Sequence, residues 1–233
     1  MYYGYGIDPT YILVIIGLII CLLAQAKMKS TFGKYSRVRN HSGMTGREAA
    51  ERILRSAGIH DVQVEHVPGN LTDHYDPRSK VLCLSDATYN SSSVAALGVA
   101  AHECGHAIQH DTGYVPLQIR GALVPVVNFG SAIAWPLIII GLLFSSRSSM
   151  VFLNLGILAF SLAVLFQIVT LPVEFNASSR AIHILGGSGI LYEDEVNATK
   201  KVLFAAALTY VAGAVSAALQ LLRIILLANN RRN

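Results

Sequence analysis

Charged residues are scarce in this chain of 233 residues, since Asp, Glu, Lys and Arg make up only 14% of it. A soluble domain carries about 25%, and the shortfall comes from long apolar runs that contain almost no charge. This scarcity excludes an ordinary water-soluble protein and indicates a chain that lies partly in a lipid bilayer. The net charge of +4 is modest, and its positive residues cluster near the ends of the apolar runs. We therefore also exclude a nucleic-acid-binding surface.

Cysteine is equally scarce, with three residues at positions 21, 83 and 104. Cys21 lies inside an apolar run, and the other two are far apart, so their spacing supports neither a metal site nor a disulfide framework. Few and unpaired cysteines are typical of a reducing compartment. This agrees with the membrane topology that the charges predict.

No Lys or Arg precedes position 27, whereas a secretory signal peptide begins with positive charge. The first apolar run, residues 11–26, is instead followed by Lys27 and Lys29. By the positive-inside rule, the N-terminus faces outward and the chain after Lys27 is cytoplasmic. We interpret residues 1–26 as an uncleaved transmembrane anchor.

Two further apolar runs, residues 122–144 and 150–171, are separated by a link that is too short to form a domain. Residues 122–171 are therefore predicted to form a transmembrane helical hairpin. The segment after it, 172–201, returns to the side of the membrane on which residues 27–121 lie, because two crossings separate them. Both segments are expected to face the cytoplasm.

The last apolar run, residues 202–227, is interrupted by Gln220 and by Arg223, which can snorkel towards the lipid headgroups. Small residues along it indicate close helix packing. The segment 202–233 is predicted either to cross the membrane or to lie at its surface as an interfacial helix. If it crosses, both termini face outward.

The segment 27–121 has the composition of a soluble domain, so we expect a small water-facing α+β unit there. The polar, turn-rich residues 70–79 are expected to be loop. The elements expected are a helix through Ala57 capped by Thr45, strands at 62–67 and 80–85, and a helix from Val94 to about His110 capped within Ser91–Ser93.

The sequence His102-Glu103-Cys104-Gly105-His106 fits the pattern H-E-x-x-H. On a helix, residues four apart lie on one face about 6 Å apart, so both imidazoles can bind one ion. Zn²⁺ accepts such nitrogens and can keep a position open for water, and Glu103 beside the first ligand can serve as general acid and base. A chance match on an amphipathic helix is the alternative, and the capped apolar lead-in from Val94 disfavours it.

A catalytic zinc site needs a third protein ligand. His110 lies a full turn beyond His106, too far from an ion held by His102. Glu174 is the better candidate, because it follows the third apolar run and lies on the same side of the membrane as the motif. Two histidines and one glutamate are a known set of catalytic zinc ligands. A solvated acid at the end of a span is the alternative for Glu174.

The motif is followed, beyond a transmembrane hairpin, by Glu174-Phe175-Asn176-Ala177-Ser178, which has the pattern E-F-x-A-S. In this the chain resembles the YugP-type membrane zinc metallopeptidases over nearly its whole length. It is more distantly similar to the HtpX-type and CAAX-prenyl endopeptidases, whose second motif is E-F-x-A-D. The resemblance implies a bacterial inner membrane and a multi-pass helical protein of the α+β class with a small gluzincin-like protease domain.

The resemblance also implies a site: His102, His106 and Glu174 as ligands of Zn²⁺, with Glu103 as the catalytic general acid and base. In the distant relatives the final Asp of the motif orients a ligand histidine. Ser178 stands there in this chain and can form a hydrogen bond but supplies no charge.

Gluzincin-like enzymes bind extended substrate on an edge strand before the motif helix, which corresponds here to residues 80–85. An ordinary internal strand is the alternative for this segment. An oxyanion stabiliser is also expected, and Arg180, His183 and Tyr192 are candidates. The acidic residues 193–195 are expected to be a solvated loop at the start of the last helix.

The function predicted is a membrane-anchored zinc endopeptidase that acts near the cytoplasmic face on membrane-associated or unfolded proteins. A site-2-type intramembrane protease is one alternative, but the apolar stretch before His102 is too short to cross the bilayer. A non-catalytic zinc-binding scaffold is another, and Glu103 speaks against it because a structural site needs no general base. A transporter is disfavoured, because the apolar runs contain almost no ionisable residues.

Overall fold

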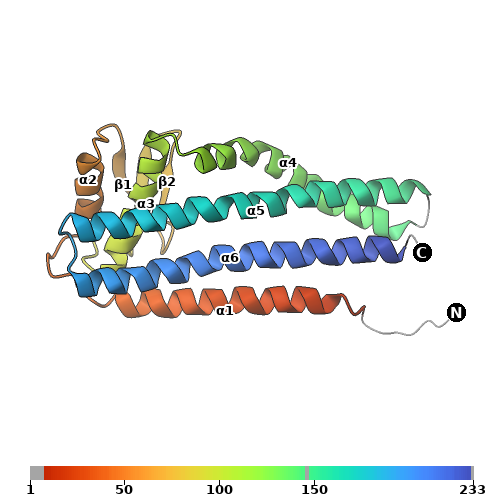
Figure 1. Cartoon of the computed structure of the whole chain (residues 1–233), viewed down its shortest axis with the longest axis horizontal. Coiled ribbons are helices and arrows are strands. Elements are labelled where there is room, and N and C mark those ends of the chain that lie inside the picture. The colour runs from red at the N-terminus through yellow and green to blue at the C-terminus, as the bar shows by residue number, and fades with distance from the viewer. Residues whose placement is uncertain (1–7, 145–146, 232–233) are drawn as a thin grey trace. The chain divides into compact units, whose positions relative to one another are not determined.

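The computed structural model describes residues 8–144 and 147–231 (Figure 1). Within them the chain forms helices and one small sheet, so the α+β class is confirmed. The elements are α1 (Tyr11–Tyr35), α2 (Gly46–Ser56), β1 (Gln63–Val67), β2 (His74–Asp76), β3 (Val81–Ser85), α3 (Val94–Asp111), α4 (Val115–Leu143), α5 (Arg147–Gly187) and α6 (Glu193–Asn230).

The chain divides into two compact units whose borders fall inside the four long helices. Unit 1 consists of the described residues of 1–24, 119–170 and 210–233, and unit 2 of residues 25–118 and 171–209. The domain limits expected from the sequence were placed where the apolar runs end. These limits stay a prediction. Helices do not end there: α5 passes through Pro172 without interruption to Gly187.

Among the described residues, four helices are long and apolar enough to cross a membrane: α1, α4, α5 and α6. They contain the four apolar runs of the sequence. Each helix extends past its run, and α1 continues beyond Ala26 to Tyr35. Hydropathy detects only the apolar part of a helix, whereas Lys, Met and Gln prolong it because they are good helix formers. The expected link 145–149 is in part helical, since α5 begins at Arg147; residues 145–146 lie outside the described part.

Small residues bring α1 and α6 close together within unit 1. A Cβ built on Gly17 would lie 2.8 Å from the Ser216 hydroxyl, and the Cys21 thiol lies 3.6 Å from the Ala212 carbonyl. The guanidinium of Arg223 lies 4.1 Å from the centre of the Tyr11 ring. The small residues of the last run thus permit the close helix contact that the sequence indicated.

The part of unit 2 that lies outside the four long helices begins with α2, which has the cap that the sequence predicts. Thr45 accepts a hydrogen bond from the Glu48 amide, and the Glu48 side chain accepts one from the Thr45 amide. This reciprocal capping box satisfies amides that the first helical turn leaves unpaired. Ala49, Ala50 and Ile53 then face the core and are almost fully buried.

The sheet has three strands in the order β1-β3-β2, where the sequence predicted two. β1 pairs with β3 in parallel, and β2 pairs with it in antiparallel orientation. β2 was missed because it is only three residues long and lies in the polar segment 70–79. The residue before β2 holds this strand against β3, since the Asp73 carboxylate accepts hydrogen bonds from the amide and hydroxyl of Ser85 on β3.

The expectation that residues 80–85 form a substrate-binding edge is wrong. β3 is the central strand, and the alternative of an ordinary internal strand applies. Leu82 and Leu84 are fully buried, so the strand has the hydrophobic character of an interior position. The sheet edge near α3 is β2, where the Tyr75 hydroxyl lies 2.9 Å from Nδ1 of His110.

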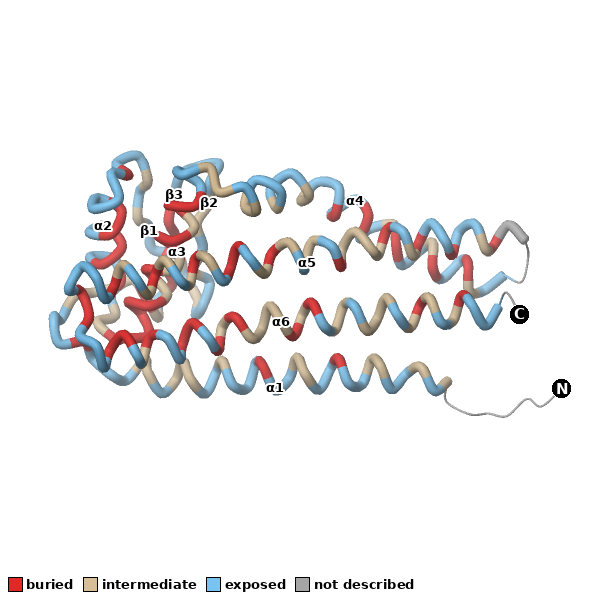
Figure 2. Tube along the Cα trace, in the orientation of Figure 1, coloured by how far each residue is buried: buried red, intermediate tan, exposed pale blue. Residues whose placement is uncertain are grey.

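The core of unit 2 is built around α3, which is buried over most of its length (Figure 2). The hydroxyl of Ser93 caps α3 by accepting a hydrogen bond from the Ala96 amide. Leu97, Ala100, Ala101 and Cys104 then pack against residues of α2, β3, α5 and α6. This packing holds the motif helix in place along its whole length.

Candidate metal centre

His102 and His106 lie on one face of α3, as their spacing of four residues predicts. Their rings meet edge to face with centroids 4.7 Å apart and an angle of 86° between the planes. The two side chains are 13% and 12% exposed. The pair is therefore close and accessible from one side only.

Glu174 reaches the same place from α5. Its Oε2 atom lies 3.3 Å from Nε2 of His102 and 3.6 Å from Nε2 of His106. One potential ligand atom from each of the three side chains lies within 4.8 Å of the others, and among the described residues these three form the only such group. The structure thus brings together the three residues that the sequence analysis expects as ligands.

The group fits zinc by its donor chemistry. Two imidazole nitrogens and one carboxylate oxygen suit Zn²⁺, whereas Ca²⁺ and Mg²⁺ prefer sets made of oxygen alone. Three protein ligands leave a fourth position for water, as in catalytic zinc sites. His102, His106 and Glu174 would hold the ion.

Each histidine has a hydrogen-bond partner at its other ring nitrogen. Nδ1 of His102 lies 3.1 Å from the Ser178 hydroxyl, and Nδ1 of His106 lies 3.0 Å from the side-chain oxygen of Gln109. Such contacts orient a ligand ring and direct the opposite nitrogen, Nε2, at the metal. Ser178 thus contacts the ring that the sequence analysis expects it to orient.

Gln109 is a residue of the site that the sequence analysis missed. It is completely buried, and its side-chain amide donates hydrogen bonds to the Val173 carbonyl and to Oδ1 of Asn176. Nε of Arg180 donates to the same oxygen of Asn176. The signal available was a glutamine three residues after the second histidine, which a helix places on the same face.

Electrostatics favour a cation at this place. Burial lowers the pKa of His106, but the close contact with Glu174, the charges of Glu103 and Glu174 and the hydrogen bond with Gln109 outweigh burial and raise it above its ordinary value. Negative charge around the histidines attracts a proton in the absence of a metal and would attract Zn²⁺ in the same way.

Gly105 allows α3 and α5 to approach closely. A Cβ at position 105 would lie 2.7 Å from the Ala177 carbonyl oxygen and 3.1 Å from the Ala177 Cα. The neighbouring Cys104 is fully buried, its thiol lies 3.7 Å from the Ala50 carbonyl, and burial raises its pKa. Cys104 is therefore a packing residue on the face away from the histidines.

Glu103 follows His102 directly, and its residue is 8% exposed. His110 lies outside the metal-binding group and contacts Tyr75 instead. The candidates for oxyanion stabilisation do not converge: Arg180 contacts Asn176, and His183 contacts the Ser179 carbonyl.

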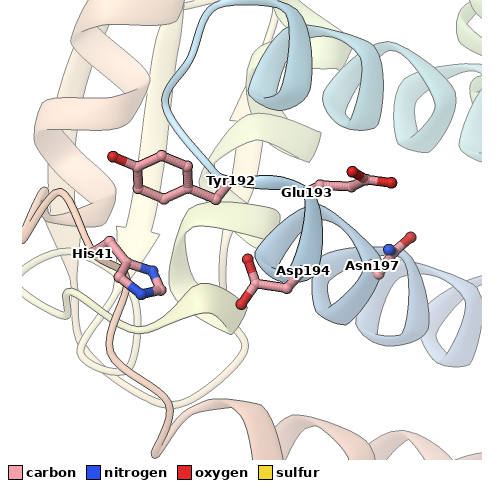
Figure 3. Close-up of a pocket in the computed structure, with 5 residues that line it drawn as sticks. All are labelled: His41, Tyr192, Glu193, Asp194 and Asn197. Carbon is pink, nitrogen blue, oxygen red and sulfur yellow. The ribbon is translucent and has the colours of Figure 1, made fainter.

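Tyr192 lines a separate open hollow of about 870 Å³ together with His41, Glu193, Asp194 and Asn197 (Figure 3). The expectation of a solvated acidic loop at residues 193–195 is wrong for Glu195, which is 3% exposed. Its carboxylate accepts hydrogen bonds from the amides of His41 and Tyr192. These acids form the first turn of α6, where the helix dipole favours negative charge.

Comparisons with known proteins place the chain in a family. A family model described as "Putative neutral zinc metallopeptidase" matches residues 10–229. The chain is 48% identical over 221 residues to a protein of Bacillus subtilis (strain 168) named "Putative membrane protease YugP". The aligned region covers 95% of this chain and 97% of the other protein. No solved structure matches the chain significantly. With two histidines and a glutamate gathered at one point and a family match over nearly its full length, the chain belongs to the neutral zinc metallopeptidase family that this model describes.

Proposed function

We propose that the chain is a membrane-embedded zinc endopeptidase of the gluzincin type. In this proposal it cleaves membrane-associated or unfolded proteins at the cytoplasmic face of a bacterial inner membrane. The observation that supports it most is the convergence of His102, His106 and Glu174, with Glu103 next to the first histidine on the same helix. Family membership supports zinc and protease chemistry independently.

Zn²⁺ at this group would supply a Lewis acid and lower the pKa of a water molecule towards about 7. The proton transfers and the positioning of the ligands are carried out by residues of the chain. Glu103 accepts a proton from the attacking water at its carboxylate and delivers it to the nitrogen of the leaving amine. Ser178 and Gln109 orient the two histidines, and the close contact at Gly105 sets the separation of the helices that present them.

Cleavage is proposed to occur near the membrane surface. The motif helix α3 is not among the four helices that are long and apolar enough to cross a bilayer. This disfavours the site-2-type alternative, in which the motif lies within a span. If cleavage maps instead to the middle of a substrate's transmembrane helix, this part of the proposal fails.

Extended substrate is proposed to pair with β2. In the described part of the chain β2 has β3 on one side and no strand on the other, and Tyr75 ties it to the end of α3. Backbone hydrogen bonds would then provide affinity. When one backbone amide beside the scissile bond of a substrate peptide is N-methylated, the peptide should be cut about fivefold more slowly, since one pairing bond is worth about 1 kcal/mol. Equal cleavage of both peptides would contradict strand pairing.

The decisive experiment compares wild-type protein with Glu103→Gln in detergent, at matched zinc content, with casein as an unfolded substrate. Loss of the general base should reduce cleavage about 10²- to 10⁴-fold while zinc stays bound. Glu193→Gln, the same change at an exposed position, is the control and should cleave like wild type.

Removal of zinc with 1,10-phenanthroline should abolish cleavage, and added Zn²⁺ should restore it. Cleavage by Glu103→Gln at the wild-type rate would reject the proposed mechanism. Bound zinc without cleavage by either protein would favour the non-catalytic scaffold.

A further inference from the structure

The three side chains Gln109, Asn176 and Arg180 form a hydrogen-bonded chain that ends on His106. Arg180 Nε lies 2.8 Å from Asn176 Oδ1, which lies 3.0 Å from Gln109 Nε2, and Gln109 Oε1 lies 3.0 Å from His106 Nδ1. None of these three residues is one of the proposed ligands or the proposed base. Their arrangement nevertheless determines how one ligand is presented.

In this series of hydrogen-bonded side chains, the chemical groups themselves determine which atom donates and which accepts. Arginine can only donate, so the Asn176 atom facing Arg180 is the oxygen. The Val173 carbonyl can only accept, so the Gln109 atom that lies 2.8 Å from it is the nitrogen. The oxygen of Gln109 therefore faces His106, and Nδ1 of His106 must carry the proton. Nε2, on the side of Glu174, is then the nitrogen available to bind the proposed metal.

Gln109 also connects two of the proposed ligands. Its oxygen holds the ring of His106 on α3, and its nitrogen holds the carbonyl of Val173, the residue before Glu174 on α5. Because Gln109 is completely buried, no water competes for these bonds. Movement of either helix would break one of them.

The other histidine is held differently. The partner of His102 is the hydroxyl of Ser178, which can rotate and either donate or accept. Ser178 therefore does not by itself impose a tautomer on His102. The fixed tautomer in this site belongs to His106.

We propose that Gln109 is a positioning residue for the metal centre, which imposes the metal-binding tautomer on His106 and is itself held in one orientation by Asn176 and Arg180. This inference rests on the proposed function, because it presumes that His106 binds Zn²⁺. It adds a residue outside the H-E-x-x-H and E-F-x-A-S patterns whose removal weakens metal binding. Loss of such a partner reduces metal affinity about 10- to 100-fold.

The test measures zinc affinity in detergent by competition with a chromophoric chelator. Each protein is first stripped of metal, and only variants whose thermal unfolding profile matches that of wild type are compared. Gln109→Met removes all three side-chain hydrogen bonds of Gln109 at similar volume and should weaken zinc binding about 10- to 100-fold. Gln63→Met makes the same change on β1, away from the site, and should bind zinc like wild type. Co²⁺-substituted protein provides a second readout, since Gln109→Met should also change the visible d–d spectrum.

A second pair of variants acts on Gln109 through its neighbour. Asn176→Leu removes the acceptor and should weaken zinc binding. Asn176→Asp keeps an acceptor for both Gln109 and Arg180 and should retain most of the affinity. This pair keeps the proposal testable if Gln109→Met fails to fold.

Wild-type zinc affinity together with an unchanged Co²⁺ spectrum in Gln109→Met, or equal losses in Asn176→Asp and Asn176→Leu, would overturn the inference and leave the protease proposal intact. Failure of the wild-type protein to bind zinc would overturn both.

Discussion

Gly105 of α3 lies against the backbone of Ala177 of α5, so that a Cβ at position 105 would stand 2.7 Å from the Ala177 carbonyl oxygen. This contact lies between the two helices that bring the histidines and Glu174 together. Glycine normally lowers the stability of a helix. At position 105 it is needed because no larger residue allows α3 and α5 to approach as closely.

Gly105→Ala should force α3 and α5 apart and destabilise the protein by about 1–3 kcal/mol, as overpacking does elsewhere. Zinc affinity should fall as well, because Glu174 moves with α5. The control is Gly33→Ala in α1, where a Cβ meets nothing within 4 Å. Thermal unfolding and chelator competition measure both effects, and equal behaviour of the two variants would contradict this account.

Glu174→Gln should lose zinc more severely than the roughly 10- to 100-fold expected for an outer partner, because it removes the negative charge beside both histidines. His110→Ala should keep both zinc and activity, since its ring contacts Tyr75 and lies outside the metal-binding group. Metal analysis after dialysis and casein cleavage measure the two outcomes. The opposite pattern would show that the ligands are assigned wrongly.

Ser178→Ala should weaken zinc binding by about tenfold, because His102 loses the hydroxyl that lies 3.1 Å from its Nδ1. Ser178→Asp should bind zinc at least as tightly as wild type, since a carboxylate accepts the proton of Nδ1 and fixes the tautomer. Isothermal titration with Zn²⁺ compares the three proteins. Tighter binding by the alanine variant than by the aspartate variant would argue against an orienting role.

Zinc affinity should fall as the pH is lowered. Only neutral imidazole binds the metal, and without metal the pKa of His106 lies above its ordinary value. Protons therefore compete with Zn²⁺ at a higher pH than for an isolated histidine. The apparent Kd should rise about tenfold per pH unit for each imidazole that is protonated, measured between pH 8 and pH 5. A constant Kd over this range would exclude ligation by His106.

The proposed orientation can be tested with introduced cysteines and a membrane-impermeant maleimide. Asn70→Cys, in the loop before β2, should react only after the membrane is permeabilised. Asn230→Cys, at the end of α6, should react in intact cells if all four helices cross. The unsubstituted protein is the background, since Cys83 and Cys104 are buried. Reaction of Asn70→Cys in intact cells would show that the orientation in the membrane is opposite to the proposed one.

The sequence predicted the elements whose signals are local. Thr45 and Ser93 cap helices through hydrogen bonds from amides three residues away, and four apolar runs mark the long helices. The histidine pair needs only helical spacing. Glu174 needed more, namely the parity of the spans and the resemblance to a family.

Features that depend on distant partners could not be predicted in this way. β2 exists because β3 and Asp73 hold it, and the central place of β3 depends on that pairing. The burial of Glu195 depends on His41, which is 154 residues away in the chain. Gln109 looks like an ordinary polar residue of a helix until α5 is placed against it.

The division of the metal-binding group between α3 and α5 has a consequence during synthesis. Glu174 follows His106 by 68 residues, and a ribosome adds about 5–20 residues per second. For roughly 3–14 s the emerging chain therefore carries its histidine pair and its proposed general base without the carboxylate that completes the group. The nascent protein cannot assemble the complete group until the segment with Glu174 has been made, so under the proposed function proteolysis beside its own unfinished chain would start only after that point.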